Sequence, residues 1–130
     1  MKKGDLITPV SFPPIALPQL KAYGKAARDP NPIHWDEAIA KKAGLPGCIA
    51  HGMLISAFVA NTAEKYLALK KGWSLTNFKT RFLGMTLLGD TVSVQGKVSN
   101  VTDQEITLDL KAVNQKGDLL ATGEAKFGKN

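Results

Sequence analysis

The sequence predicts an α+β domain in which an antiparallel β-sheet packs against one long helix. Residues 53–71 are nearly free of helix breakers and are apolar on almost every side as far as Ala60, which is typical of a buried helix. After this run, apolar and polar residues alternate in three successive segments, as in half-buried antiparallel strands. Helical and loop-rich sequence at the front followed by strands indicates the α+β class.

The front of the chain predicts short elements only. Residues 6–20 carry four of the seven prolines, which excludes a central strand and favours an irregular or edge element. A short helix is predicted over residues 17–27, with Pro18 tolerated in its first turn. A second short helix is predicted over residues 37–43, where Asp36 can cap the N-terminus and a glycine and a proline follow the end.

Strands account for most of the second half of the chain. The alternating segments are residues 92–98, 106–112 and 119–127, and residues 75–82 supply one more predicted strand. The sequence NQKGD at residues 114–118 predicts a hairpin turn between the last two strands.

Length and composition predict a single soluble domain over residues 1–130. Apolar residues make up 44% of the chain and charged residues 22%, as in an ordinary globular protein. We find neither an apolar signal-peptide run nor the roughly 18 apolar residues needed to span a bilayer, so a cytoplasmic location is expected. Cys48 is the only cysteine, which excludes an intrachain disulfide and favours a small buried side chain over a nucleophile.

The charge balance favours an acidic partner or a phosphate-bearing ligand. The chain has 17 Lys and Arg against 11 Asp and Glu, a formal net charge of +6. The basic residues are scattered, however, and no aromatic-interleaved basic stripe or nucleic-acid-binding motif is present. We therefore expect neither a nucleic-acid nor a membrane partner.

The stretch RDPNPIHWD contains the first candidate catalytic residues. Pro30 and Pro32 fix their own φ angles and push Asp29 and Asn31 out of the α region. We therefore expect an extended, stiff brace that presents Asp29 and His34 in a defined geometry, as catalytic groups require. The alternative is that the aspartate forms a turn and that the histidine is an ordinary surface or core residue.

The stretch IAHGML contains the second candidate feature, at the start of the long helix. Unpaired backbone N–H groups and the positive end of the helix dipole favour a developing negative charge at Gly52. One such oxyanion donor is worth about 2.7 to 4 kcal/mol in other enzymes. The alternatives are that Gly52 only permits tight packing and that His51 satisfies a hydrogen bond in the core.

Together these stretches resemble a known family. YGKAARDPNPIHWD followed by GLPGCIAHGML is similar to the motifs of the MaoC-like, or (R)-specific enoyl-thioester hydratase, family. NPIHWDEAIAKKAGL and IAHGML are especially similar to the catalytic subunit of two-subunit (3R)-hydroxyacyl-ACP dehydratases. KTRF also matches the strand after the long helix, and the resemblance covers most of the chain.

The resemblance implies a hot-dog fold, in which a curved antiparallel sheet wraps around the long helix. It also implies a homodimer, or a heterodimer with a sister hot-dog subunit, with an acyl tunnel near the interface. By position, Asp29 and His34 become the catalytic pair and the Gly52 N–H the oxyanion donor. Four further residues are expected to contact the substrate: Asn31, His51, Met53 and Ala57.

The implied activity is that of a hydro-lyase in fatty-acid metabolism. It would interconvert trans-2-enoyl and (3R)-3-hydroxyacyl thioesters of CoA or acyl-carrier protein, without a cofactor or a metal. A carboxylate and an imidazole, with reference pKa values of about 3.9 and 6.5, can divide acid and base roles around one water molecule. The alternatives are a partner subunit that is inactive alone and a hot-dog thioesterase.

The sequence departs from the family pattern at two places. Ala27-Arg28 replaces the usual Ser-Gly before the aspartate, so that Arg28 is expected either to point into solvent or to meet a phosphate of the carrier. Ala60 stands where some members place a serine.

Other polar residues of the front region have expected structural roles. We expect Asn31 to hold the loop through a backbone hydrogen bond and Asp36 to cap a helix. His34, Asp36 and His51 do not have the spacing of a recognised metal-ligand set.

Overall fold

The chain folds into a five-stranded antiparallel sheet with one long helix on one face. The computed structural model describes residues 1–67 and 70–130. The elements are β1 (Leu6–Ser11), α1 (Leu17–Ala26), the 3₁₀ helix η1 (Pro32–His34), α2 (Glu37–Lys42), α3 (Gly52–Leu67), β2 (Trp73–Phe82), β3 (Ser93–Val101), β4 (Glu105–Val113) and β5 (Leu119–Lys129). The strand order is β1-β3-β4-β5-β2. The predicted α+β class is confirmed.

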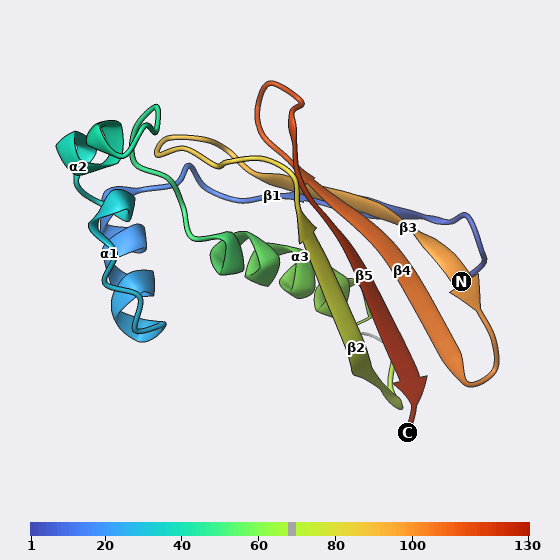
Figure 1. The fold of residues 1–130 in the computed structure, drawn as a ribbon. Coiled ribbons are helices and arrows are strands. Elements are labelled where there is room, and N and C mark those ends of the chain that lie inside the picture. Colours follow the sequence, from blue (N-terminus) through green and yellow to red (C-terminus); the bar gives the residue numbers. More distant parts are fainter. Residues whose placement is uncertain (68–69) are drawn as a thin grey trace.

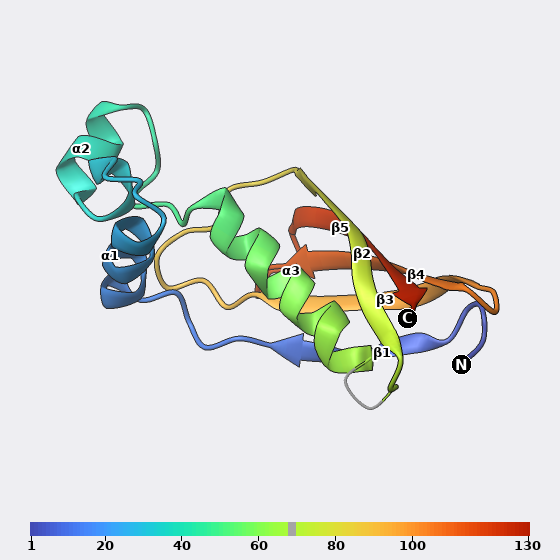
Figure 2. The same cartoon turned by 90° about the horizontal axis from the view of Figure 1, so that it is seen from below.

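At one end of the molecule, two short helices extend beyond the sheet. Figures 1 and 2 show α3 lying along one face of the sheet, while α1 and α2 project beyond the end of the sheet near the start of α3. The other face of the sheet carries no helix in the described part of the chain. The first residues of α3 therefore lie between the sheet and the two short helices.

The strands form because their alternating apolar residues all face α3. Val94 and Val98 of β3, and Leu108 of β4, are each 0% exposed. The register pairs Val98 with Leu108, so these buried side chains form a continuous layer across the sheet. The predicted hairpin is also confirmed, since the Asn114 N–H donates to the Asp118 carbonyl at 3.0 Å.

β1 shows how the proline-rich front is accommodated. It pairs with β3 alone and forms one edge of the sheet, as the sequence predicts. Pro9 lies where the register shifts between Ile7 and Val10, so its missing N–H interrupts no regular ladder.

The predicted long helix is confirmed, but its first and last residues differ from the prediction. α3 begins at Gly52, one residue earlier than expected, and buries Ile55, Val59 and Ala63 against the sheet. It ends at Leu67 rather than at residue 71, because residues 70–72 form a bend and turn with Gly72 at a φ of 87°. Residues 68 and 69 lie outside the described residues. None of the helices described is long and apolar enough to cross a bilayer.

Gly123 of β5 sets how closely α3 approaches the sheet. A Cβ atom added at this position would lie 2.7 Å from Val59 Cγ1, closer than carbon atoms can pack. Val59 is itself fully buried. The glycine is therefore required by the contact between helix and sheet.

We predict that Gly123→Ala destabilises the fold by about 1 to 3 kcal/mol, the usual cost of overpacking a core. Val59→Ala removes the clashing methyl groups, so the double variant should be less destabilised than the sum of the two single variants. Urea unfolding of the four proteins measures this coupling. Strictly additive losses would show that Gly123 does not limit the approach of α3.

Candidate active site

The loop after α1 places Asp29 by an unusual backbone conformation. Arg28 has a φ of 55°, in the left-handed region that favours glycine. This residue lets the Asp29 N–H turn back and donate to the Gly24 carbonyl at 2.8 Å, as in a helix C-terminal cap. Arg28 thus occupies the place where the family pattern has glycine, and its exposed side chain agrees with the solvent-facing alternative.

The brace between Asp29 and His34 is only partly extended, so the prediction of a fully extended segment is wrong. Asn31 is extended, with φ −62° and ψ 118°, but residues Pro32–His34 form the 3₁₀ helix η1. The fixed φ of Pro32 suits the first position of such a turn as well as an extended chain. Asn31 Oδ1 accepts the Ile33 N–H at 3.2 Å, which confirms its predicted role in holding the loop.

His34 is fixed by a bond to the segment that leads into α3. It is 6% exposed, and its Nδ1 lies 2.7 Å from the Ile49 carbonyl oxygen. Because a carbonyl only accepts, Nδ1 carries the proton of this bond, and the Nε2 of a neutral His34 is free to accept. That Nε2 lies 3.7 Å from Asp29 Oδ2. The structure thus brings the predicted pair together.

His51 completes a three-residue cluster. Its ring stacks on that of His34, with centroids 3.5 Å apart and planes 21° from parallel. Its Nε2 lies 3.9 Å from Asp29 Oδ2. Although His51 is only 4% exposed, neither ring nitrogen meets a hydrogen-bond partner among the described residues. The alternative that His51 satisfies a core hydrogen bond is therefore not supported by the geometry.

Sequence reasoning missed Gly24, which lets this cluster close. A Cβ atom there would lie 2.9 Å from both the Asp29 carbonyl and Trp35 Cζ3, and 3.4 Å from His51 Nε2. The available signal was a glycine inside a predicted helix, where it costs about 1 kcal/mol relative to alanine and so calls for a packing or functional reason.

The surroundings of the cluster lower the pKa of His51 and so favour its neutral form. Burial lowers the pKa of His51, a charge on the adjacent His34 lowers it further, and Asp29 acts in the opposite direction. The Asp29 side chain is 47% exposed, so the carboxylate can be reached from solvent. The cluster therefore offers an accessible carboxylate oxygen beside two buried imidazole nitrogens, an arrangement that can bind and deprotonate a small hydroxyl group.

The same cluster is a poor metal site in this arrangement. Ligand atoms of Asp29, His34 and His51 lie within 4.8 Å of one another. However, the lone pairs of stacked, nearly parallel imidazoles lie in offset planes, whereas tetrahedral coordination needs them to converge on one ion. Asp36 is not part of the cluster, because its Oδ1 accepts the Ile39 N–H at 3.1 Å and caps α2 as predicted.

Gly52 is the first residue of α3, where its N–H points out of the helix start. A Cβ atom here would lie 3.4 Å from the Phe82 ring, which is ordinary van der Waals contact. The tight-packing alternative for this glycine is therefore not supported. Met53 is 62% exposed and Ala57 is also exposed, and their i, i+4 spacing puts them on one outer side of α3.

Cys48 and Ala60 lie outside the cluster of Asp29, His34 and His51. Cys48 is buried, as predicted, and burial together with the Glu37 carboxylate raises the pKa of its thiol, which disfavours a nucleophilic thiolate. Ala60 is half-buried. One turn before it, the Ser56 hydroxyl lies 2.8 Å from the Thr80 hydroxyl and joins α3 to β2.

Comparison with known proteins places this geometry in a family. Residues 9–118 match the model of the MaoC-like domain, and the chain belongs to that family. It is 34% identical over 108 residues to the fatty acid synthase beta subunit TOXC of Cochliobolus carbonum, covering 82% of this chain but 5% of that protein. The chain thus spans a small fraction of the length of this relative.

Solved structures show the same fold. The (R)-hydratase from A. caviae involved in PHA biosynthesis matches with a TM-score of 0.88 and 25% identity, covering 100% of this chain and 98% of that one. The ChsH1-ChsH2 complex from Mycobacterium tuberculosis matches with a TM-score of 0.86 and 17% identity, covering 99% of this chain and 98% of that one. The predicted hot-dog fold, with α3 as the central helix, is confirmed.

We predict that His51 makes the fold less stable as the pH falls below about 6.5, its unfolded-state pKa. Its pKa is lower in the folded state, so the unfolded chain binds the extra proton first and unfolding is favoured by acid. His51→Gln should lose less stability than the wild type between pH 7.5 and 5.5 in urea unfolding. An equal loss in both proteins would contradict a depressed pKa at His51.

Proposed function

We propose that this chain is a hydro-lyase that interconverts trans-2-enoyl and (3R)-3-hydroxyacyl thioesters of CoA or acyl-carrier protein in fatty-acid metabolism. Residues 1–130 act as one hot-dog domain in this proposal. The observation that carries it is the 3.7 Å approach of Asp29 Oδ2 to an oriented His34 Nε2. Membership of the MaoC-like family and similarity to an (R)-hydratase support it.

The proposed reaction begins with a water molecule bound between Asp29 and His34. One member of this pair takes a proton from the water as its oxygen bonds to C3 of the enoyl thioester. The electron pair of the C2–C3 double bond moves toward the thioester carbonyl, which becomes enolate-like. The other member enters the step protonated and delivers its proton to C2 as the carbonyl re-forms, and the proton taken from the water then passes through solvent to reprotonate this member, so that one water is added and the pair is unchanged.

In this scheme, the Gly52 N–H stabilises the enolate-like intermediate. The negative charge on the thioester oxygen needs a donor that is in place before the reaction, so that no reorganisation is required. The backbone N–H at the first position of a 16-residue helix offers such a donor together with the helix dipole.

We predict that Asp29→Asn and His34→Ala each lower turnover by at least about a hundredfold while the fold remains intact. Loss of enoyl absorbance with crotonyl-CoA measures the activity, and circular dichroism checks the fold. Cys48→Ala, at a buried position outside the cluster, is the control and should keep its activity. Full activity in either site variant would exclude the proposed pair.

A separate prediction isolates the Gly52 N–H. Proline is tolerated at the first position of a helix and lacks the N–H, so Gly52→Pro should fold and lose about a hundredfold or more in kcat. Gly52→Ala keeps the N–H and adds a Cβ atom in ordinary contact with Phe82, so it controls for the added bulk. Equal losses in both variants would show that bulk, rather than the donor, matters.

The second part of the proposal is that the active unit contains another hot-dog subunit, either a second copy or a sister chain. Large apolar side chains are exposed around the start of α3 and the end of β2, namely Met53, Phe82, Leu83 and Met85. Exposed apolar surface of this kind marks protein interfaces. The ChsH1-ChsH2 complex gives a precedent for this fold with two different chains.

A partner subunit also explains how Met53 and Ala57 would contact the substrate. Both residues face outward from α3, so in one chain alone they do not enclose an acyl group. A second subunit that covers this side of the helix would turn them into the wall of an acyl tunnel. The alternative of a chain that needs a sister subunit for activity rests on this same surface.

A further inference from the structure

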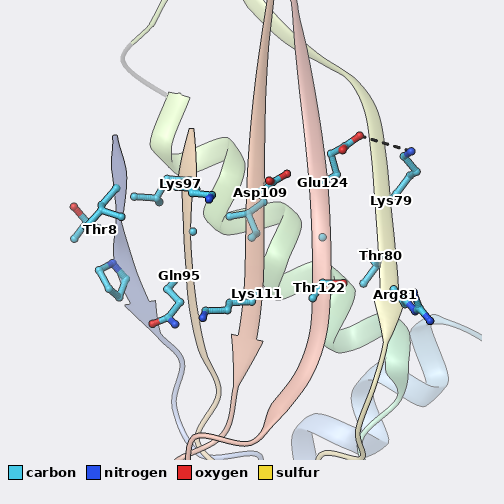
Figure 3. A pocket seen from close by; sticks show the side chains of 16 residues that line it. Thr8, Lys79, Thr80, Arg81, Gln95, Lys97, Asp109, Lys111, Thr122 and Glu124 are labelled. Carbon is cyan, nitrogen blue, oxygen red and sulfur yellow. Dashed lines mark ion pairs between the residues drawn. The ribbon is translucent and has the colours of Figure 1, made fainter. Parts of the chain in front are cut away.

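The face of the sheet that points away from α3 is hollow. Residues from all five strands line a cavity of about 1090 Å³ on this face. Figure 3 shows the polar side chains of this lining projecting from the strands, with α3 behind the sheet. The hollow therefore lies on the face opposite α3, and none of its lining residues belongs to the Asp29, His34 and His51 cluster.

One row of side chains across this face compensates its own charges. The strand register places Lys97, Asp109, Glu124 and Lys79 side by side on β3, β4, β5 and β2. The Lys79 ammonium lies 3.7 Å from the Glu124 carboxylate (Figure 3). Lys126 approaches the same carboxylate to 3.9 Å. The two acidic residues of this row lie between its two basic residues, so the row as a whole carries little net charge.

The neighbouring row is cationic. The register aligns Gln95, Lys111, Thr122 and Arg81 across the same four strands, and we call these residues the cationic row. Lys111 and Arg81 are exposed, and no described residue forms an ion pair with either. The row contains no acidic residue, so two positive charges remain available to a partner.

The backbone spacing of these two residues favours one shape of partner. β4 and β2 are separated by β5, which puts the Cα atoms of Lys111 and Arg81 two strand spacings, about 9.6 Å, apart. Two carboxylates seven residues apart on one side of a helix are about 10.5 Å apart. Same-side neighbours on a strand are about 6.8 Å apart and match less well.

We propose that the cationic row is a docking surface for an acidic helix of another protein, with carboxylates seven residues apart. Lys111 and Arg81 pair with these carboxylates, while Thr122 offers a hydrogen bond between them and Gln95 offers one beside Lys111. Leu6, which is 82% exposed, and Pro9 add apolar contact at the β1 side of the hollow.

Charge disfavours a second copy of this chain as the occupant. Two copies with their cationic rows facing would set Lys111 and Arg81 of one against those of the other. Like charges set against each other in this way oppose association. The proposal does not depend on the reaction at Asp29 and His34, because the row lies outside that cluster.

The test measures binding of a synthetic, side-chain-stapled helical peptide to the full chain by fluorescence anisotropy. The peptide carries two glutamates seven residues apart, and a control peptide carries them five residues apart, on different sides of the helix. The double variant Lys111→Gln/Arg81→Gln is compared with Lys116→Gln/Lys129→Gln, which removes the same charge from positions outside the hollow.

We expect the Lys111/Arg81 variant to bind the first peptide at least about tenfold more weakly, and the Lys116/Lys129 variant less than about twofold more weakly. The control peptide should bind wild type no better than it binds the Lys111/Arg81 variant. Circular dichroism should show that both double variants fold, since all four side chains are exposed.

Three outcomes would overturn the proposal. Equal weakening of peptide binding in the two double variants would mean that binding depends only on the net charge of the chain. Equal binding of the two peptides would remove the argument from spacing. Tighter, row-dependent binding of a 20-nucleotide single-stranded DNA than of the peptide would identify a nucleic acid as the occupant.

Discussion

The hydrogen bond between His34 Nδ1 and the Ile49 carbonyl, at 2.7 Å, is the interaction on which the candidate site depends. It joins two segments that are 15 residues apart, the proline loop and the approach to α3. By occupying Nδ1 it directs Nε2 toward Asp29, and it holds the His34 ring where His51 can stack on it. A buried donor of this kind is costly to leave unpaired, so this one bond favours a single ring orientation.

The two histidines have different surroundings despite their contact. His34 has a fixed backbone partner, whereas His51 has two buried nitrogens without one. A buried polar group without a hydrogen-bond partner lowers the stability of the fold unless another interaction compensates for the lost hydrogen bonds to water. In the proposed reaction, these nitrogens are available to a substrate oxygen that binds beside Asp29.

The sheet has faces with opposite properties, and this division organises the molecule. The face toward α3 is apolar and so closely packed that Gly123 is needed beneath Val59. The other face is polar, and one of its rows keeps two uncompensated cations. The curved sheet thus separates the proposed chemistry near the start of α3 from a surface suited to recognition.

The sequence by itself determined the elements of the fold. Period-two alternation identified β3, β4 and β5, proline density identified the edge strand, and a nearly breaker-free apolar run identified α3. These predictions succeeded because each rests on local periodicity and on residues with restricted backbone angles. The 3₁₀ turn at Pro32–His34 was predicted wrongly, since the fixed φ of proline is compatible with more than one local structure.

Only the tertiary structure decided how the candidate site is assembled. The sequence indicated Asp29, His34 and Gly52, but it could not show that Gly24 gives room for the cluster or that His51 lacks a hydrogen bond. The sequence did not reveal the cationic row either, because Lys111 and Arg81 are 30 residues apart and come into one row only through the strand order. Side-chain periodicity is a property of one segment, whereas such contacts depend on how segments distant in the chain pack together.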